Sequence, residues 1–278
     1  MIDISSKLIR AAYFLFRPFI SLILTERFLL SLVKGRRHLL VIAPMKSGST
    51  WLSTILEHLT GWRTSLLAPA YCQRGQEIEL RHLVTRNALR NTVFSHLHLR
   101  YSDYSERIIR ETGLQCVLMT RNIYDTIISL ADHCDKYSLK KPLFYMAEVD
   151  WRGLSREEKI DRIIDLAVPW YFNFYAGWFS NIERLNGQIV VVRYEDLVSD
   201  TERELKVICE KFGIEQHMAP GEAISFCEGQ PTLKNTGIPG RGAELSKAVV
   251  EKVERMASYY PSVDFTSIGI FCKHQEPV

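Results

Sequence analysis

A short polar stretch, Lys46-Ser47-Gly48-Ser49-Thr50, carries the residue types that bind a phosphate group. It joins one cation, one glycine and three hydroxyl groups, and it lies between two apolar segments. Backbone N–H groups at the start of a helix, together with a lysine and hydroxyl donors, form a cradle for an anion. Nucleotide kinases and ATPases write this loop as G-x-x-x-x-G-K-[ST], whereas here Lys46 precedes Gly48 and no glycine opens the loop. The order predicts a phosphate cradle of a different kind.

A second pair of residues could bind another phosphate. Arg121 follows the apolar run Gln115–Thr120, and Ser129 comes eight residues later. An arginine at the end of a strand and a serine two helical turns further on can both point at one phosphate, charge and hydroxyl together. Such a pair is common by chance, so it indicates a phosphate site only in combination with the first motif.

These residues need a scaffold, and the apolar pattern supplies one. The run Leu39–Ala43 predicts a buried strand, and Ser49 or Thr50 is expected to cap the helix that starts near Trp51. Further strands are predicted at Thr92–His96, Gln115–Thr120 and Gln188–Arg193, the last as fully buried. Strands that alternate with helices predict an α/β fold with a central parallel sheet flanked by helices, which binds ligands at the carboxyl ends of its strands.

The remaining segments are assigned from composition and periodicity. Helices are expected over 77–91, through 127–130, over 162–181, from Asp200 to Phe212 with Asp200 or Thr201 as N-cap, and over 245–258. Connections are expected over 60–76 and 229–242, and a loop or lid over 136–155. The aromatic residues along Trp170–Trp178 are read as core.

The order Pro-x-Lys-Ser-Gly-Ser-Thr-Trp over residues 44–51 resembles the 5′-phosphosulfate loop of the sulfotransferases that use 3′-phosphoadenosine 5′-phosphosulfate (PAPS). The resemblance extends over residues 39–260 and implies a single-domain, P-loop-NTPase-like sulfotransferase fold. It implies PAPS as the cofactor, 3′-phosphoadenosine 5′-phosphate (PAP) as the product and no required metal. In that family the segment like Leu118–Asp125 grips the 3′-phosphate through an arginine and a serine, which here are Arg121 and Ser129.

The same resemblance implies further cofactor-binding residues. Tyr194, in Tyr194-Glu195-Asp196, would lie near the nucleotide, while Trp51 and Phe226 would hold the adenine. Arg241 and Gly242 resemble the Arg-Lys-Gly loop that closes over the 3′-phosphate, although only one basic residue stands beside the glycine here. The complete set of expected cofactor-binding residues is Lys46, Ser47, Gly48, Ser49, Thr50, Trp51, Arg121, Ser129, Tyr194, Phe226, Arg241 and Gly242.

A hydroxyl acceptor needs a base that removes its proton as the new bond forms, and histidine suits neutral pH. His96, in Phe94-Ser95-His96, resembles the family's Lys-Thr-His base with the lysine replaced. His98 would face the opposite side of an extended strand, so His96 is the favoured base. Lys46 is the second expected catalytic residue, because it would stabilise charge on the leaving phosphate.

Length and charge fit this interpretation. The 278 residues, with a formal charge of +3 and a pI near 8.5, indicate one globular domain and suit a small polyanionic ligand rather than nucleic acid. The six cysteines are scattered, which favours reduced thiols and a cytoplasmic location, with a disulfide such as Cys227 with Cys272 left open. No feature of the sequence predicts the oligomeric state.

The amino terminus is predicted separately from the catalytic domain, as an apolar helical segment over 1–35 before a sulfotransferase domain over 36–278. Its longest uncharged run, Pro18–Thr25, is too short to span a bilayer. Two interpretations of residues 4–33 stay open, either a helical pair packed on the domain or an amphipathic segment on a membrane surface.

The predicted function is transfer of a sulfuryl group from PAPS to the hydroxyl of a small acceptor, with aromatic content favouring a hydrophobic alcohol, phenol or lipid. A carbohydrate acceptor is the first alternative. An ATP-dependent small-molecule kinase and a non-catalytic, membrane-associated nucleotide-binding scaffold are the others. The residue order around Gly48 and the lack of a clear magnesium-holding aspartate disfavour the kinase, and the presence of Lys46 with His96 disfavours the scaffold.

Overall fold

The fold is seen in a computed structural model that describes residues 37–65, 76–78, 83, 91–136, 146–185, 187–228 and 238–271, with only the backbone at 95–97. Its centre is a sheet of five strands in the order β2-β3-β1-β4-β5, and every described pair is parallel. The strands are β1 (His38–Ile42), β2 (Arg63–Ser65), β3 (Thr92–Leu97), β4 (Gln115–Thr120) and β5 (Ile189–Arg193). The predicted α/β fold with a parallel sheet is confirmed.

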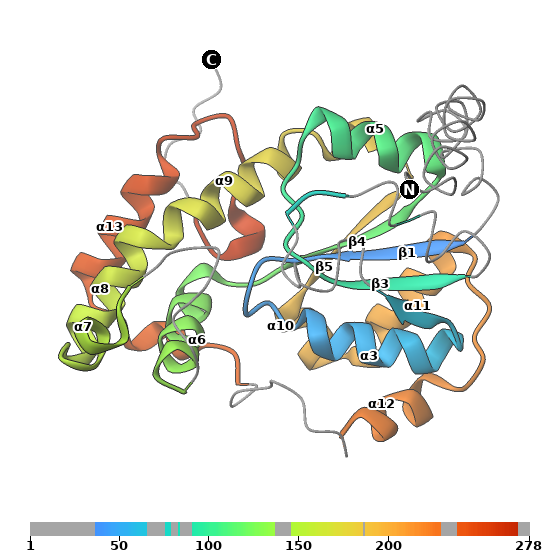
Figure 1. The fold of residues 1–278 in the computed structure, drawn as a ribbon, viewed down its shortest axis with the longest axis horizontal. Coiled ribbons are helices and arrows are strands. Elements are labelled where there is room, and N and C mark those ends of the chain that lie inside the picture. Colours follow the sequence, from blue (N-terminus) through green and yellow to red (C-terminus); the bar gives the residue numbers. More distant parts are fainter. Residues whose placement is uncertain are drawn as a thin grey trace, which may run out of the picture.

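Helices cover both faces of the sheet (Figure 1). One face carries α3 (Ser49–Thr60), α11 (Thr201–Phe212) and α12 (Pro220–Glu228). The other carries α5 (Asp103–Thr112), α6 (Ile123–Lys136), α8 (Arg156–Leu166), α9 (Val168–Phe179) and α13 (Lys247–Ala257). The remaining elements are α7 (Glu148–Arg152), α10 (Tyr194–Ser199) and the short 3₁₀ helices η2 (Ile182–Leu185), η3 (Arg241–Glu244) and η4 (Thr266–Ile268).

The central strand β1 shows why this sequence forms a two-sided sheet. Leu39 and Val41 pack in the core beneath α3 and α11, whereas Leu40 and Ile42 pack in the opposite core, and all four are fully buried. Alternation along a strand sends successive side chains to opposite faces, so a continuous apolar run suits a strand that is covered on both sides. The carboxyl ends of the strands therefore share one edge, at the left of Figure 1.

Several expected elements differ from the structure. The predicted helix over 162–181 is two helices, α8 and α9, because Pro169 stands in the first turn of α9. The strand over 188–193 is not fully buried, since β5 lies at an end of the described sheet and Val191 is 37% exposed. The connection over 60–76 contains β2, and the expected loop over 136–155 contains α7.

The strands at Thr92–Leu97 and Gln115–Thr120, the start of α11 after Asp200, and α13 agree with prediction. Cys227 is a free, buried thiol, so the disulfide that had been left open does not form in the described chain. The predicted segment 1–35, most of the helix over 77–91 and Cys272 lie outside the described residues. Within the described residues, no helix has both the length and the apolar character needed to cross a membrane.

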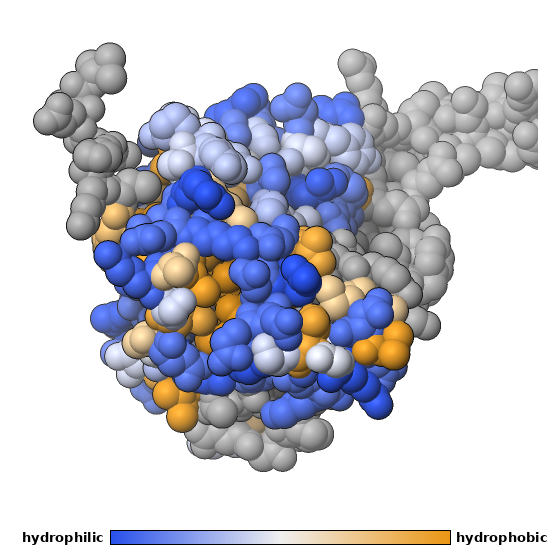
Figure 2. Space-filling model, turned by 90° about the vertical axis from the view of Figure 1, so that its left-hand side faces the viewer, coloured by the Kyte–Doolittle hydropathy of each residue, from blue (hydrophilic) through white to orange (hydrophobic). Residues whose placement is uncertain are grey.

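Figure 2 views the molecule from the left-hand side of Figure 1, where the strands end. On this side hydrophobic side chains lie in a hollow framed by hydrophilic ones.

Candidate nucleotide-binding and catalytic site

The chain leaves β1 through a tight loop over residues 43–48, called here the phosphate loop, and enters α3. Lys46 has a φ of 66° and Gly48 a φ of 86°, both in the left-handed region. Gly48 is the N-cap of α3 and no side chain caps this helix, so the predicted capping by Ser49 or Thr50 is wrong. The backbone reverses in the loop itself, which leaves both hydroxyl residues in the first helical turn.

Gly48 is needed for a second reason. A Cβ atom at this position would lie 2.6 Å from Cδ2 of Tyr194, because the tyrosine ring packs directly against the loop. Tyr194 begins α10 after β5 and is almost fully buried, and burial raises the pKa of its hydroxyl. Tyr194 therefore stands directly beside the phosphate loop.

Arg121 also packs against that ring. Its guanidinium carbon is 4.2 Å from the centre of the Tyr194 ring, and Nη1 donates to the carbonyl oxygen of Lys46 at 2.6 Å. The side chain is only 7% exposed, and its Nε has no hydrogen-bond partner among the described residues. A buried donor without a protein partner is costly, so this guanidinium suits an anionic ligand.

The first turn of α6 is built by Asn122. Its side-chain oxygen accepts hydrogen bonds from the N–H groups of Tyr124 and Asp125, and its own N–H donates to Oε1 of Glu195 at 2.9 Å. Ser129 lies further along the same helix and is 2% exposed. Arg121 therefore precedes α6 and Ser129 lies within it, so the helix fixes the distance between the two residues.

Arg241 and Gly242 come from a loop over 238–244, called here the closing loop, which is held on α6. The two oxygens of Asp125 accept hydrogen bonds from the N–H groups of Gly240 and Gly242, each at 2.7 Å. Arg241 forms an ion pair with Asp132 at 2.8 Å. Asp132 is three residues beyond Ser129, so the closing loop is held on the same helix that carries Ser129.

Phe226 and Trp51, the two rings expected to hold the adenine, come from the neighbouring helices α12 and α3. Phe226 is 51% exposed, and its ring centre is 4.1 Å from that of His58, near the end of α3. Trp51 is in the first turn of α3, half-buried against the core. Trp51 therefore belongs to α3 itself, and Phe226 packs on the last turns of that helix.

The expected base, His96, lies in β3, but its side chain is outside the described residues. His98 follows the strand, where strand alternation no longer fixes its direction. Its Nδ1 is 2.8 Å from the carbonyl oxygen of Ala43, and its ring stands edge-on to Trp170. Since a carbonyl only accepts, Nδ1 carries the proton of this bond.

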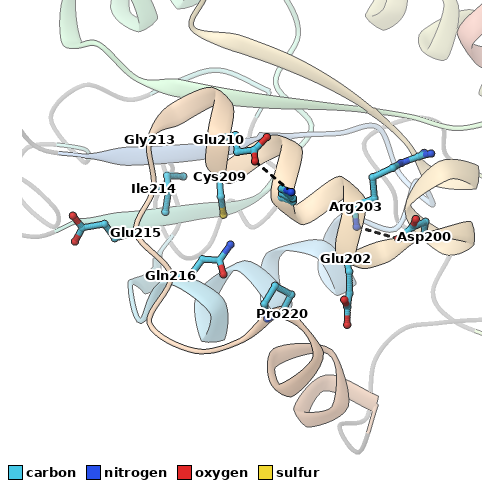
Figure 3. Close-up of a pocket in the computed structure, with 11 residues that line it drawn as sticks. Asp200, Glu202, Arg203, Cys209, Glu210, Gly213, Ile214, Glu215, Gln216 and Pro220 are labelled. Atoms are coloured by element: carbon cyan, nitrogen blue, oxygen red, sulfur yellow. Dashed lines mark hydrogen bonds and ion pairs between the residues drawn. The ribbon is translucent and has the colours of Figure 1, made fainter.

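A separate groove runs along α11 and the segment that follows it (Figure 3). It is lined by side chains of both charges, among them Glu202, Lys206 and Glu210. None of the expected site residues lines this groove, so it is not the site that the sequence predicts.

Comparison with known proteins agrees with this geometry. Residues 36–228 match the family described as Sulfotransferase domain. The protein belongs to this sulfotransferase family. A search of curated proteins found no match.

Solved structures with the same architecture include mouse sulfotransferase SULT7A1 complexed with PAP, with a TM-score of 0.61 and 13% identity over 86% of this chain and 91% of that chain. Retinol dehydratase in complex with androsterone and inactive cofactor PAP has a TM-score of 0.57 and 12% identity over 81% of this chain and 80% of that chain. Sulfotransferase STF1 from Mycobacterium tuberculosis H37Rv has a TM-score of 0.50 and 12% identity over 83% of this chain and 78% of that chain. At these identities the likeness shows a shared fold.

Proposed function

We propose that the protein transfers a sulfuryl group from PAPS to a hydroxyl group of a small acceptor. The observation that carries the proposal is the meeting of the phosphate loop, Arg121 and Tyr194 at the carboxyl edge of the sheet. The loop offers amides and a lysine, and a buried guanidinium lies directly behind it. This set of donors fits a doubly phosphorylated nucleotide, and PAP is bound in the solved structures of two proteins of similar fold.

The roles of the residues follow from their positions. Lys46 and the loop amides would hold the 5′-phosphosulfate, while Arg121, Ser129 and Arg241 would hold the 3′-phosphate. When bound, PAPS supplies an activated sulfuryl group whose leaving group is a phosphate. Lys46 would place a positive charge where negative charge develops on that phosphate, which lowers the barrier to transfer. No metal is required in this arrangement.

We retain His96 as the proposed base. Its strand runs parallel to β1 and ends at the same edge as the phosphate loop. The backbone register there is shifted between Leu40 and Ile42, which moves the end of β3 relative to β1. A positioned base typically contributes about 10² to 10⁴ in rate.

A hydrophobic acceptor is the proposed substrate class, whether an alcohol, a phenol or a lipid. The hollow at the strand-end side of the molecule exposes hydrophobic side chains (Figure 2), and such a surface suits an apolar ligand better than a charged polysaccharide. Retinol dehydratase, whose fold is similar, has been crystallised with androsterone and with retinol.

The test first measures which nucleotide stabilises the protein and then measures transfer of sulfate to an acceptor. PAP without magnesium should raise the melting temperature, and ATP with magnesium should not, because the loop lacks the kinase order around Gly48. Labelled sulfate should then pass from PAPS to members of a panel of hydrophobic alcohols and phenols, with oligosaccharides as the comparison. Stabilisation by ATP with magnesium alone would instead support the kinase alternative.

We also propose a cytoplasmic location, on the basis of the scattered cysteines and the four free, buried thiols Cys116, Cys134, Cys209 and Cys227. Contact of residues 4–33 with a membrane surface remains the second interpretation of that segment.

A further inference from the structure

Four consecutive carbonyl groups of the phosphate loop are each bound by a side-chain donor. His98 Nδ1 binds the oxygen of Ala43 at 2.8 Å, and Ser47 Oγ binds that of Pro44 at 2.7 Å. The hydroxyl of Tyr171 binds the oxygen of Met45 at 3.0 Å, and Arg121 Nη1 binds that of Lys46 at 2.6 Å. Three of these donors come from outside the loop.

This arrangement determines where the loop amides point. In a trans peptide the C=O of one residue and the N–H of the next point in opposite directions. Holding the carbonyls of Pro44, Met45 and Lys46 therefore fixes the N–H groups of Met45, Lys46 and Ser47, each opposite to the carbonyl before it. Successive N–H groups that face one side form an anion-binding concavity.

Tyr171 is the donor that neither the sequence nor the proposed chemistry accounts for. It lies on α9, 126 residues from Met45, and its ring is 1% exposed. Trp170 stands edge-on to it at a ring distance of 5.4 Å, which helps to fix its orientation. Burial raises the pKa of Tyr171 well above its ordinary value, so the hydroxyl stays a donor throughout the physiological range.

We propose that Tyr171 is a positioning residue that pre-arranges the phosphate loop for the 5′-phosphate of the nucleotide, acting only through the carbonyl of Met45. The proposal rests on the nucleotide-binding function proposed above. It goes beyond that function by giving the aromatic helix α9 a role in donor binding, and by confining this role to one of the two phosphates.

Tyr175 provides a matched control. It lies one turn further along α9, is 1% exposed, and its hydroxyl faces the backbone of Arg121 rather than a carbonyl of the phosphate loop. Tyr171→Phe and Tyr175→Phe therefore each remove one buried hydroxyl group from the same helix, but only Tyr171→Phe removes a hydrogen bond to the phosphate loop.

The experiment measures binding of three nucleotides to the full chain by calorimetry or competition. The probes are PAP, adenosine 5′-phosphate and adenosine 3′-phosphate. For Tyr171→Phe we expect PAP and adenosine 5′-phosphate to bind roughly 5 to 20 times more weakly, the loss typical of one buried hydrogen bond. Adenosine 3′-phosphate should change by less than about twofold. The KM for PAPS should rise while the KM for the acceptor stays the same.

Tyr175→Phe should bind all three nucleotides like the wild type. Equal loss of all three in Tyr171→Phe would show a general structural role and overturn the proposal, as would unchanged binding of PAP. If the wild type itself binds neither PAP nor adenosine 5′-phosphate, the proposed function fails. If the wild type binds both and Tyr171→Phe binds them equally well, only the role of Tyr171 fails.

Discussion

Arg121 and Ser129 are both proposed to bind the 3′-phosphate, but their contacts in the structure differ. Arg121 also holds the carbonyl of Lys46, whereas no such contact with the loop is seen for Ser129. Ser129→Ala should therefore weaken PAP by about ten- to a hundredfold, as expected for one charged hydrogen bond, and leave adenosine 5′-phosphate unchanged. Arg121→Ala should weaken PAP by a similar factor and adenosine 5′-phosphate as well. Calorimetry with both ligands measures this difference, and equal binding of the two nucleotides to the wild type would contradict the 3′-phosphate assignment.

The two neighbouring histidines should also behave differently. His96→Ala is expected to lower kcat by about 10² to 10⁴ with little effect on the affinity for PAP, because a base acts on the acceptor. His98→Ala removes a donor to Ala43, so it should weaken PAP while reducing kcat less. Steady-state kinetics and PAP titration of both variants give the comparison. Near-normal turnover in His96→Ala with collapse in His98→Ala would assign the base to His98.

The residues expected to contact the nucleotide were easier to predict than the residues that hold them in place. Lys46, Gly48 and Arg121 stand in a recognisable order along the chain, and the structure gathers them. Tyr171 was read as core because aromatic residues at helical spacing usually are, and its ring is indeed buried. Only the position of α9 over the loop, which no local pattern encodes, turns its hydroxyl into a donor to Met45.

The helix α6 and the closing loop act as a pair of elements, joined by Asp125. Asp125→Ala removes the acceptor for Gly240 and Gly242, so hydrogen exchange at both amides should accelerate and PAP should bind about tenfold more weakly. Asp135→Ala is the control, because that carboxylate on the same helix pairs instead with Arg156 and Lys159.

A second variant tests the same junction by steric means. A Cβ atom at Gly242 would lie 2.4 Å from Cβ of Tyr124, so Gly242→Ala should displace the loop and weaken PAP in the same way. If both variants bind PAP like the wild type, the closing loop has no part in nucleotide binding.

The elements that were predicted best are those whose apolar pattern has one interpretation. The buried runs of β1 and β4 could only be strands of a covered sheet. The run in β5 looked the same, yet strand order is set by tertiary pairing, and β5 lies at an end of the described sheet. The helix α5 was missed because its charged residues outnumber its apolar ones, although Ser102 forms a capping box with Ser105.

For the whole molecule, Glu106 links segments far apart in the chain and should make stability depend on pH. Its buried carboxylate accepts a hydrogen bond from Tyr101 and pairs with Arg110 and Arg184. The hydrogen bond from Tyr101, followed by Arg110, lowers the pKa of Glu106, while burial and Glu106 raise the pKa of Tyr101 to about 12.

A lowered pKa in the folded state means that Glu106 stabilises the fold above the unfolded value of about 4.3. This contribution is lost as pH falls through the lower, folded value. Glu106→Gln should reduce the melting temperature by roughly 2–6 °C at pH 7, and the difference should shrink below about pH 4. Calorimetric scans between pH 7 and 3.5 measure it, with the exposed Glu111→Gln as control. A difference that grows on acidification would reverse the assigned sign.

Arg37 is bonded to three residues of the described fold. Its Nη1 donates to the carbonyl of Gly213 at 2.6 Å, and its backbone bonds to Asn91 and Thr92. A chain that begins at Lys34 keeps all of these bonds, so it should stay folded. If residues 4–33 lie on membranes, this shorter chain should also gain solubility and lose binding to acidic liposomes in a flotation assay. Aggregation or unfolding would support the helical pair packed on the domain.

The backbone at Lys46 costs the fold some stability, and we propose that the chemistry of the lysine is the reason. Its backbone φ of 66° is unfavourable for any residue with a Cβ atom, by roughly 1–2 kcal/mol. Glycine would relieve this strain but would discard the ammonium group that the reaction is proposed to need. Selection for a stable fold alone would therefore favour glycine at position 46, whereas selection for turnover would favour lysine. A lineage in which this position has changed to glycine would be expected to retain the fold after losing the activity.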